Sequence, residues 1–213
     1  MAATPEADPT EVVKATAQLL LLPQHLPAPD AAPAPEPPLR VVIIRHGEKP
    51  EQGDNLSVAG LNRALALPTV LARVFSIPPS HTFVPEIGIG GKRTTRMRML
   101  QTVMPYAVQH NLTIDTNYEV ESSRQFAKRL RRLRGNVLVV WEHHNIVEIA
   151  RDLGLKDAQE WDSDDFDSIW TITFERLGRV KDDRPAKAKK PRLTISRQGL
   201  NPSGEFLDHR AGE

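Results

Sequence analysis

The chain is predicted to fold as an α/β domain, a three-layer αβα sandwich around a largely parallel central sheet. Short apolar segments rich in β-branched residues alternate with longer segments of helical periodicity, and this order is typical of parallel strands covered by helices on both faces. The 213 residues, 39% hydrophobic and 26% charged, are enough for one packed domain. We therefore expect one sheet whose strand ends converge on a crevice.

The expected strands are short and lie at residues 39–44, 82–84, 136–141, 169–174 and 192–196. The last two could pair as a hairpin across a long loop. Four helices are expected between the strands, at residues 57–75, 95–110, 121–134 and 145–153. Ser57 is a suitable N-cap for the first helix, whereas Pro68 and Pro105 are expected to kink or interrupt the first and second.

The two ends of the chain differ in composition from this core. Residues 1–38 are rich in Pro and Ala, and the prolines between residues 23 and 38 predict an extended, unpacked segment. Within it, residues 9–21 could form one helix. The predicted domain covers residues 39–200, and residues 201–213 form a polar C-terminal tail.

Composition also excludes several classes of function. A net charge of +1 gives no overall electrostatic case for binding nucleic acid, and the absence of cysteine excludes disulfides, thiolate metal sites and cysteine nucleophiles. No apolar stretch approaches the roughly 20 residues that span a bilayer. The basic runs at 128–134 and 187–192 are interpreted as a solvated helix face and a proline-bearing loop. The first eight residues carry acids and no base, so a cytoplasmic location is expected, with secretion as the alternative.

One decapeptide carries the strongest chemical signal. The apolar run at residues 41–44 ends in Arg45 and His46, and Gly47 then breaks the strand. Ligands of open α/β sheets bind at the carboxyl ends of the strands. An imidazole at such an end can attack phosphorus, and a neighbouring guanidinium can hold a phosphate group by two parallel hydrogen bonds.

The segment Arg45-His46-Gly47-Glu48 resembles the opening motif of the histidine phosphatase superfamily, whose fold is called phosphoglycerate mutase-like. Three further segments resemble the family's motifs in the family's order. The first is the helix entry at 56–64, where the family has Leu-Thr-x-x-Gly-x-x-Gln-Ala and this chain departs from it at Ser57 and Arg63. The other two are the Arg-x-x-Gln-Thr element at 98–102 and the second-histidine strand end at 139–145. The resemblance covers roughly residues 40–175.

The resemblance implies roles for individual residues. His46 would attack phosphorus and carry a phosphohistidine, with its other ring nitrogen held by a hydrogen bond that fixes the tautomer. Arg45, Arg98 and His143 would complete the phosphate pocket, and Asn145 would contribute to substrate binding. Arg93 and Arg96 compete with Arg98 for its place, as His144 does with His143.

The general acid is the least certain part of this assignment. Many members of the family place Asp directly after the second histidine, but here His144 stands there. Glu48 is given the catalytic role, with three carboxylates as alternatives: Glu119, Glu121 and Glu148. Glu142, which replaces the family's usual Gly, could orient a histidine or point away along its strand.

The sequence therefore predicts a phosphomonoester hydrolase that needs neither metal nor other cofactor. Its substrate would be a small phosphorylated metabolite or a phosphoprotein, and specificity would lie in loops 78–92 and 161–167. Alternatives are a catalytically weak phospholigand-binding domain, a phosphoglycerate mutase-type phosphotransferase, and a metal site built from His46, Glu48, His144 and Glu148. Neither a nucleic-acid partner nor a membrane span is expected, and the oligomeric state cannot be inferred.

Overall fold

A computed structural model describes residues 37–90, 93–94, 96–174 and 191–206 of the chain, without side chains at 89–94. The possible helix at 9–21, almost all of the predicted N-terminal segment and most of the second basic run lie outside these residues. Within them, no helix is long and apolar enough to cross a membrane.

The main sheet has six strands in the order β5-β2-β6-β1-β7-β8. The strands are β1 (Arg40–Arg45), β2 (His81–Phe83), β5 (Ile114–Asp115), β6 (Asn136–Trp141), β7 (Ser168–Thr173) and β8 (Arg192–Arg197). The first four named run parallel to one another, whereas β7 is antiparallel to both of its neighbours. The predicted largely parallel sheet and terminal hairpin are thus confirmed.

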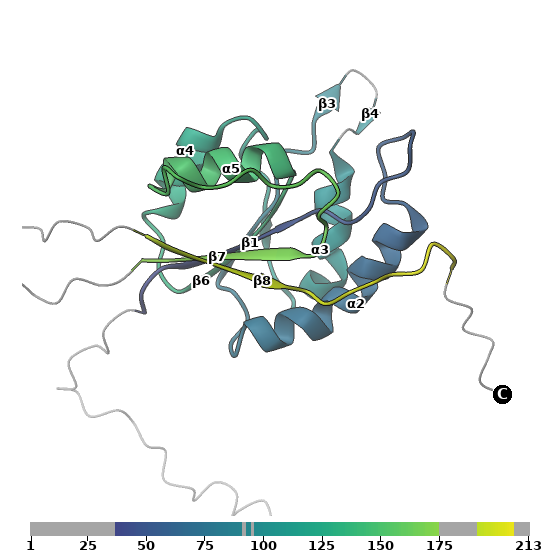
Figure 1. The fold of residues 1–213 in the computed structure, drawn as a ribbon, viewed down its shortest axis with the longest axis horizontal. Coiled ribbons are helices and arrows are strands. Elements are labelled where there is room, and N and C mark those ends of the chain that lie inside the picture. The colour runs from purple at the N-terminus through teal and green to yellow at the C-terminus, as the bar shows by residue number, and fades with distance from the viewer. Residues whose placement is uncertain (1–36, 91–92, 95, 175–190, 207–213) are drawn as a thin grey trace, which may run out of the picture. The chain divides into compact units, whose positions relative to one another are not determined.

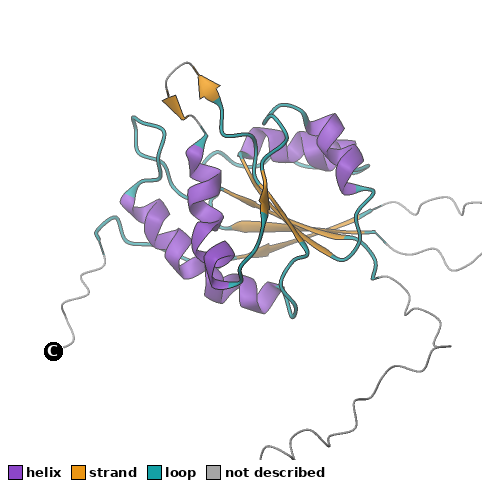
Figure 2. Ribbon diagram, turned by 180° about the vertical axis from the view of Figure 1, so that it is seen from behind, coloured by secondary structure: helices purple, strands orange, loops and turns teal. Residues whose placement is uncertain are grey.

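Helices cover both faces of this sheet, as Figures 1 and 2 show. The helices α2 (Val58–Val74) and α3 (Met97–Gln109) pack on one face, and α4 (Ser123–Leu130) and α5 (His143–Asp152) pack on the other. Alternate residues of β1 enter the two cores: Val41 and Ile43 face α4 and α5, and Val42 and Ile44 face α2 and α3. This period of two is why the central strands are apolar throughout.

Several boundaries differ from those expected. Helix α4 is shorter than the predicted 121–134, and α5 begins at residue 143 rather than at residue 145. Ser57 caps α2 by accepting a hydrogen bond from the Gly60 amide (3.2 Å), and Pro68 and Pro105 lie inside α2 and α3. The sequence did not predict β5 or the small antiparallel pair of β3 (Ile89–Gly90) and β4 (Arg93–Thr94), which are two residues long and carry little pattern.

Candidate active site

The two histidine motifs meet because their strands are neighbours. Strand β1 pairs with β6 in parallel, with Arg45 opposite Trp141, so both strands end at the same edge of the sheet. The His46 amide continues the ladder by donating to the Trp141 carbonyl (3.1 Å). His143 follows two residues after Trp141, as the first residue of α5.

His46 is held as a neutral imidazole with one nitrogen committed to the backbone. The side chain is buried, and its Nδ1 lies 2.7 Å from the Gly47 carbonyl, which can only accept, so Nδ1 carries the proton. Burial, with smaller contributions from the charges of Arg45, Arg98 and His143, lowers the pKa of His46 to about 4. At neutral pH, Nε2 therefore keeps its lone pair.

Arg45 is buried at the end of β1, and its guanidinium is oriented by a loop far away in the sequence. Nη1 donates to the carbonyl oxygens of Ser163, Asp165 (3.3 Å) and Asp162 (3.5 Å), and the Phe166 ring lies 3.9 Å from the guanidinium carbon. Burial lowers the pKa of Arg45 to about 10, against the opposing charges of nearby carboxylates, so it stays charged at neutral pH. Its Nε is buried and has no partner among the described residues.

Arg98 is the second residue of α3, and only part of its guanidinium has a protein partner among the described residues. Its Nη1 donates to the Gly53 carbonyl (3.2 Å), while its Nε is buried without a partner among the described residues. Arg96 instead bonds with Glu121 (3.1 Å) on the surface, and the side chain of Arg93 is outside the described structure. The charge of Arg98 contributes to the lowered pKa of His46.

His143 presents a third buried nitrogen of this kind. Its Nδ1 has no partner among the described residues, and burial together with the charge of Arg45 lowers its pKa to about 4. His144, its competitor, is exposed, with its ring centroid 3.9 Å from that of His143. The position of His143 also matters, because the first turn of a helix has free amide groups and a partial positive charge that favour an anion.

Gln101 and Thr102, which follow Arg98 in its motif, hold the backbone around these groups in place. Thr102 accepts a hydrogen bond from the Gly47 amide (2.9 Å) and donates to the Arg98 carbonyl (2.7 Å), which ties α3 to the loop after β1. Gln101 accepts from the Leu56 amide (3.0 Å) and donates to Asn55 (2.7 Å). The Gln-Thr pair thus fixes the backbone at both ends of the segment between β1 and α2.

Two glycines allow the loop after β1 to press against α2. A Cβ on Gly60 would lie 2.3 Å from the Glu48 carbonyl oxygen, and a Cβ on Gly47 would lie 2.9 Å from the Gly60 carbonyl oxygen. Ser57 clamps the same contact, since both its amide (2.9 Å) and its hydroxyl (3.2 Å) donate to the Glu48 carbonyl. This explains why a glycine follows His46 and why another opens α2.

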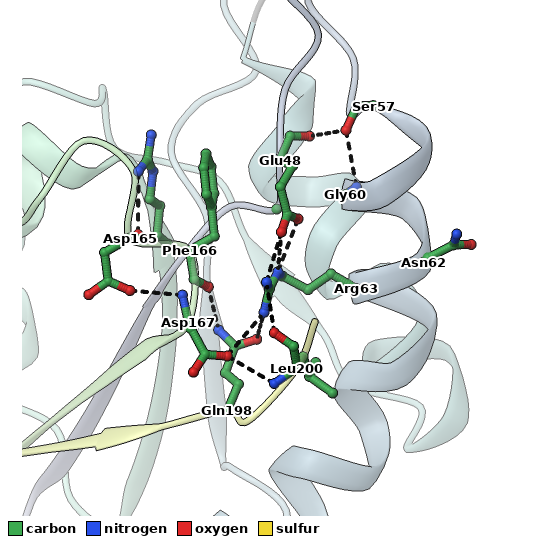
Figure 3. A network of polar contacts seen from close by, with 12 residues as sticks. Glu48, Ser57, Gly60, Asn62, Arg63, Asp165, Phe166, Asp167, Gln198 and Leu200 are labelled. Carbon is green, nitrogen blue, oxygen red and sulfur yellow. Dashed lines mark hydrogen bonds and ion pairs between the residues drawn. The ribbon is translucent and has the colours of Figure 1, made fainter. Parts of the chain in front are cut away.

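Glu48 is drawn into a structural ion pair instead of standing free beside His46. Its carboxylate accepts hydrogen bonds from Nε (3.0 Å to each oxygen) and Nη2 (2.7 Å) of Arg63, which is buried (Figure 3). Two of the alternative acids are also paired, Glu121 with Arg96 and Glu148 with Arg151 (2.6 Å). Glu119 is exposed.

The remaining candidates sit at the start of α5. Glu142 is the N-cap residue of α5, and its carboxylate accepts a hydrogen bond from the side-chain amide of Asn145. The Asn145 side chain is therefore engaged with Glu142. Within the described part of the chain, no three His, Cys, Asp or Glu side chains cluster as metal ligands would, so the alternative grouping of His46, Glu48, His144 and Glu148 is not assembled.

Sequence reasoning named loop 161–167 for specificity but missed its contact with Arg45. The loop is folded on itself by its own carboxylates: Asp162 accepts from the Asp164 amide (3.0 Å), and Asp165 accepts from the amides of Asp167 and Ser168 (both 2.9 Å). The alternation of Asp and Ser in this stretch is a signal for such turns. Which arginine the loop holds depends on the sheet order, which the local sequence does not encode.

Neither a protein-family model nor a curated protein matches this sequence. Solved structures do match the fold. A protein histidine phosphatase, SixA, complexed with tungstate is 15% identical, with a TM-score of 0.50 over 64% of this chain and 88% of the other. A protein from Escherichia coli K-12 assigned as an alpha-ribazole-5'-P phosphatase is 14% identical, with a TM-score of 0.50 over 75% and 96% of the two chains. A Plasmodium falciparum phosphoglycerate mutase is 11% identical, with a TM-score of 0.41 over 71% and 96%.

Proposed function

We propose that this chain, which has the phosphoglycerate mutase-like fold of the histidine phosphatase superfamily, hydrolyses phosphomonoesters through a phosphohistidine on His46. One observation carries the proposal. Three buried nitrogens, on Arg45, Arg98 and His143, have no partner among the described residues, and the charges of all three residues act on a neutral His46. Buried polar groups are normally satisfied, so a cluster of unpaired donors indicates a place for an anion that can accept from all of them.

The geometry of the two arginines supports a phosphate as that anion. Each uses Nη1 on a backbone carbonyl, which leaves Nε and Nη2 as a parallel pair of donors. That pair matches two oxygens of a phosphate group. The two positive charges also balance the dianion, and they remain where charge spreads over the equatorial oxygens during transfer.

The proposed reaction has two steps. Nε2 of His46 attacks phosphorus while the bond to the substrate oxygen breaks, and the departing alkoxide takes up a proton from solvent. Water then attacks the phosphohistidine, which breaks the P–N bond, returns one proton to solvent and releases inorganic phosphate and the free imidazole. The Gly47 carbonyl that holds Nδ1–H would stabilise the positive charge that develops on the ring in the first step.

Glu48 is a weaker candidate for the proton donor than the sequence suggested. Two nitrogens of Arg63 engage the Glu48 carboxylate, so we propose that Glu48 anchors the loop after β1. Asn145 stays a proposed substrate-binding residue, whose amide would have to share its bond to Glu142. The substrate class that we propose is a phosphorylated small molecule or a phosphoprotein, bound from the cytoplasm.

The pairing of the acids favours one second candidate. Because Glu48, Glu121 and Glu148 are each bound to an arginine, the site could bind phosphoryl groups and turn them over slowly. A phospholigand-binding domain of this kind would bind tungstate or phosphate as tightly as an enzyme does. Only the rate separates the two functions.

The test is a hydrolysis assay with p-nitrophenyl phosphate, followed by acid-free quenching to trap the phosphoenzyme. We expect turnover and a base-stable, acid-labile phosphate on wild-type protein, and neither on His46→Gln. His81→Gln is the matched control, because His81 begins β2 at the opposite edge of the sheet and should leave both unchanged. Near wild-type turnover by His46→Gln would overturn the proposed nucleophile, and tight binding of tungstate without turnover would favour the binding domain.

A further inference from the structure

Arg63 joins three separate parts of the chain around the proposed site. It is buried in α2, and its guanidinium contacts Glu48 after β1, Asp167 in the loop before β7 (3.4 Å) and Gln198 after β8 (3.0 Å), as Figure 3 shows. It also donates to the Leu200 carbonyl (3.3 Å). Nε and both terminal nitrogens therefore have protein partners, so Arg63 has little capacity left for a ligand.

Of the segments that Arg63 joins, the loop before β7 is the one that also holds Arg45. Loop 162–166 supplies the three carbonyl oxygens that hold Nη1 of Arg45 and the Phe166 ring that covers its guanidinium. Asp167, the next residue, is fixed by Arg63 on one side and by the amides of Leu200 (3.0 Å) and Gly199 (3.2 Å) on the other. Gln198 adds a second link, since its amide group donates to the Phe166 carbonyl (3.0 Å).

We propose that Arg63 is a positioning residue: it fixes loop 162–167 and Glu48 so that Arg45 presents Nε and Nη2 to the phosphate. The inference rests on the phosphate site proposed above and adds a residue that makes no contact with the substrate. It acts in two ways, one through the shape of the loop and one through charge.

The shape argument follows from the contacts. The Nη1 of Arg45 finds carbonyl acceptors only where loop 162–165 holds them, and a guanidinium is planar, so fixing Nη1 fixes the direction of the other two donors. Loss of the Arg63 to Asp167 contact would release the loop at its anchored end. Small displacements of a phosphate-binding group are costly, since about 1 Å can reduce a rate by roughly a hundredfold.

The charge argument concerns Glu48. Its carboxylate already acts electrostatically on Arg45, and Asp164 and Asp165 do so more strongly. Arg63 takes up the Glu48 carboxylate by two nitrogens, which leaves Arg45 without a competing ion pair at its free donors. With a neutral residue at position 63, Glu48 would be free to turn toward Arg45 and compete with the phosphate.

The test measures binding of sodium tungstate by calorimetry to wild type, Arg63→Gln, Asp167→Asn and Asn62→Ala. Gln is the residue that the family motif has at position 63, so Arg63→Gln is a mild change in shape that removes the charge. Asn62 is the matched control: it is the neighbouring buried residue of α2, and it binds the carbonyls of Ser203 (3.0 Å) and Glu205 (2.7 Å), away from the loop. Thermal melts of all four proteins report folding.

We expect Arg63→Gln to weaken tungstate binding by about tenfold or more, as loss of supporting contacts does at other charged sites. Asp167→Asn, which keeps the Arg63 to Glu48 pair, should weaken it less, and Asn62→Ala should change it by under about twofold even if it lowers the melting temperature. Wild-type affinity in Arg63→Gln, or an equal loss in Asn62→Ala, would overturn the inference. Should Arg63→Gln fail to fold, wild-type affinity in Asp167→Asn would do so.

A double-mutant cycle identifies the route of the effect. In an Arg45→Met background, which has neither the charge nor the planar fork, the effect of Arg63→Gln on tungstate affinity should fall to under about twofold. An undiminished effect there would mean that Arg63 does not act through Arg45. A wild-type protein that binds no tungstate at all would refute the proposed function itself, which is a different result from wild-type binding that Arg63→Gln leaves intact.

Discussion

Two buried arginines lie close to the end of β1, and their surroundings are opposite. Arg63 has partners for all three of its guanidinium nitrogens, two carboxylates among them. Arg45 has carbonyl partners for one nitrogen, an aromatic ring against its face, and a buried Nε with no partner among the described residues. Both are almost completely shielded from solvent.

The difference separates a structural charge from a functional one. A buried charge whose hydrogen bonds are complete holds segments together, as Arg63 does for the loop after β1, the loop before β7 and the segment after β8. A buried charge with donors left over is costly unless a ligand satisfies them, as a bound phosphate would at Arg45 and Arg98. Completeness of hydrogen bonding, rather than burial, therefore distinguishes the candidate ligand groups.

The largest effect that tests this distinction is expected at Arg98. Arg98→Ala removes one unsatisfied donor pair and one positive charge, so kcat/KM for p-nitrophenyl phosphate should fall by about a hundredfold or more, with little loss of stability. Arg96→Ala, two residues earlier, removes only a surface pair with Glu121 and should change kcat/KM by under about threefold. The reverse order of effects would show that the wrong arginine has been assigned to the phosphate.

The protonation of His46 makes the comparison sensitive to pH. Its pKa is about 4 in the folded protein and about 6.5 when unfolded, so the unfolded state gains a proton first as the pH falls. Stability is therefore full above about pH 6.5 and declines down to about pH 4, by about 3 kcal/mol for His46 at roughly 1.4 kcal/mol per pH unit. Urea unfolding of wild type and His46→Gln at pH 7 and pH 4.5 measures this.

The expected result is that wild type loses about 2 to 3 kcal/mol more than His46→Gln between the two pH values. His143 and every carboxylate are present in both proteins, so their contributions cancel in the difference. Equal losses would mean that His46 is not held as a neutral, buried imidazole.

Glu48 tests the structural side of the comparison. Glu48→Gln should cost about 2 kcal/mol of unfolding free energy, because a buried guanidinium loses its main ionic partner. If Glu48 is an anchor, kcat/KM should fall by a similar factor for an aryl phosphate and an alkyl phosphate. A general acid behaves differently, since its loss would slow the alkyl phosphate selectively, by about a hundredfold or more.

Local sequence predicted the parts of this molecule that local physics controls. The apolar strands, the Ser57 cap and the approach of the β1 and β6 ends follow from period-two burial, hydrogen-bonding side chains and parallel pairing. The Arg98, Gln101 and Thr102 motif marked an element that the structure ties to the segment after β1, where Thr102 binds the Gly47 amide and Gln101 binds the Leu56 amide.

The parts that sequence missed depend on contacts between distant segments. Nothing near Arg45 indicates that the carbonyls of loop 162–165 hold it, more than a hundred residues away. The sequence did not show that Glu48 is ion-paired, because its partner, Arg63, lies 15 residues later, inside α2. Arg63 itself was visible only as a departure from the family's Gln, and its partners Asp167 and Gln198 come from the last third of the chain.

The smallest expected effect concerns Ser57, which links the start of α2 to the loop after β1. Ser57 caps α2 through the Gly60 amide, and its hydroxyl donates to the Glu48 carbonyl. Ser57→Ala removes both side-chain bonds but leaves the Ser57 amide on Glu48, so it should cost about 1 kcal/mol of unfolding free energy. Because Arg63 still holds the Glu48 carboxylate, kcat/KM of Ser57→Ala should change by under about threefold. The comparison variant is Gly60→Ala, whose Cβ would meet the Glu48 carbonyl oxygen at 2.3 Å. Gly60→Ala should lose both stability and activity, since the loop after β1 must move to make room for the Cβ. A loss of activity in Ser57→Ala as large as that in Gly60→Ala would mean that the cap, and not the Arg63 ion pair, sets the position of the loop.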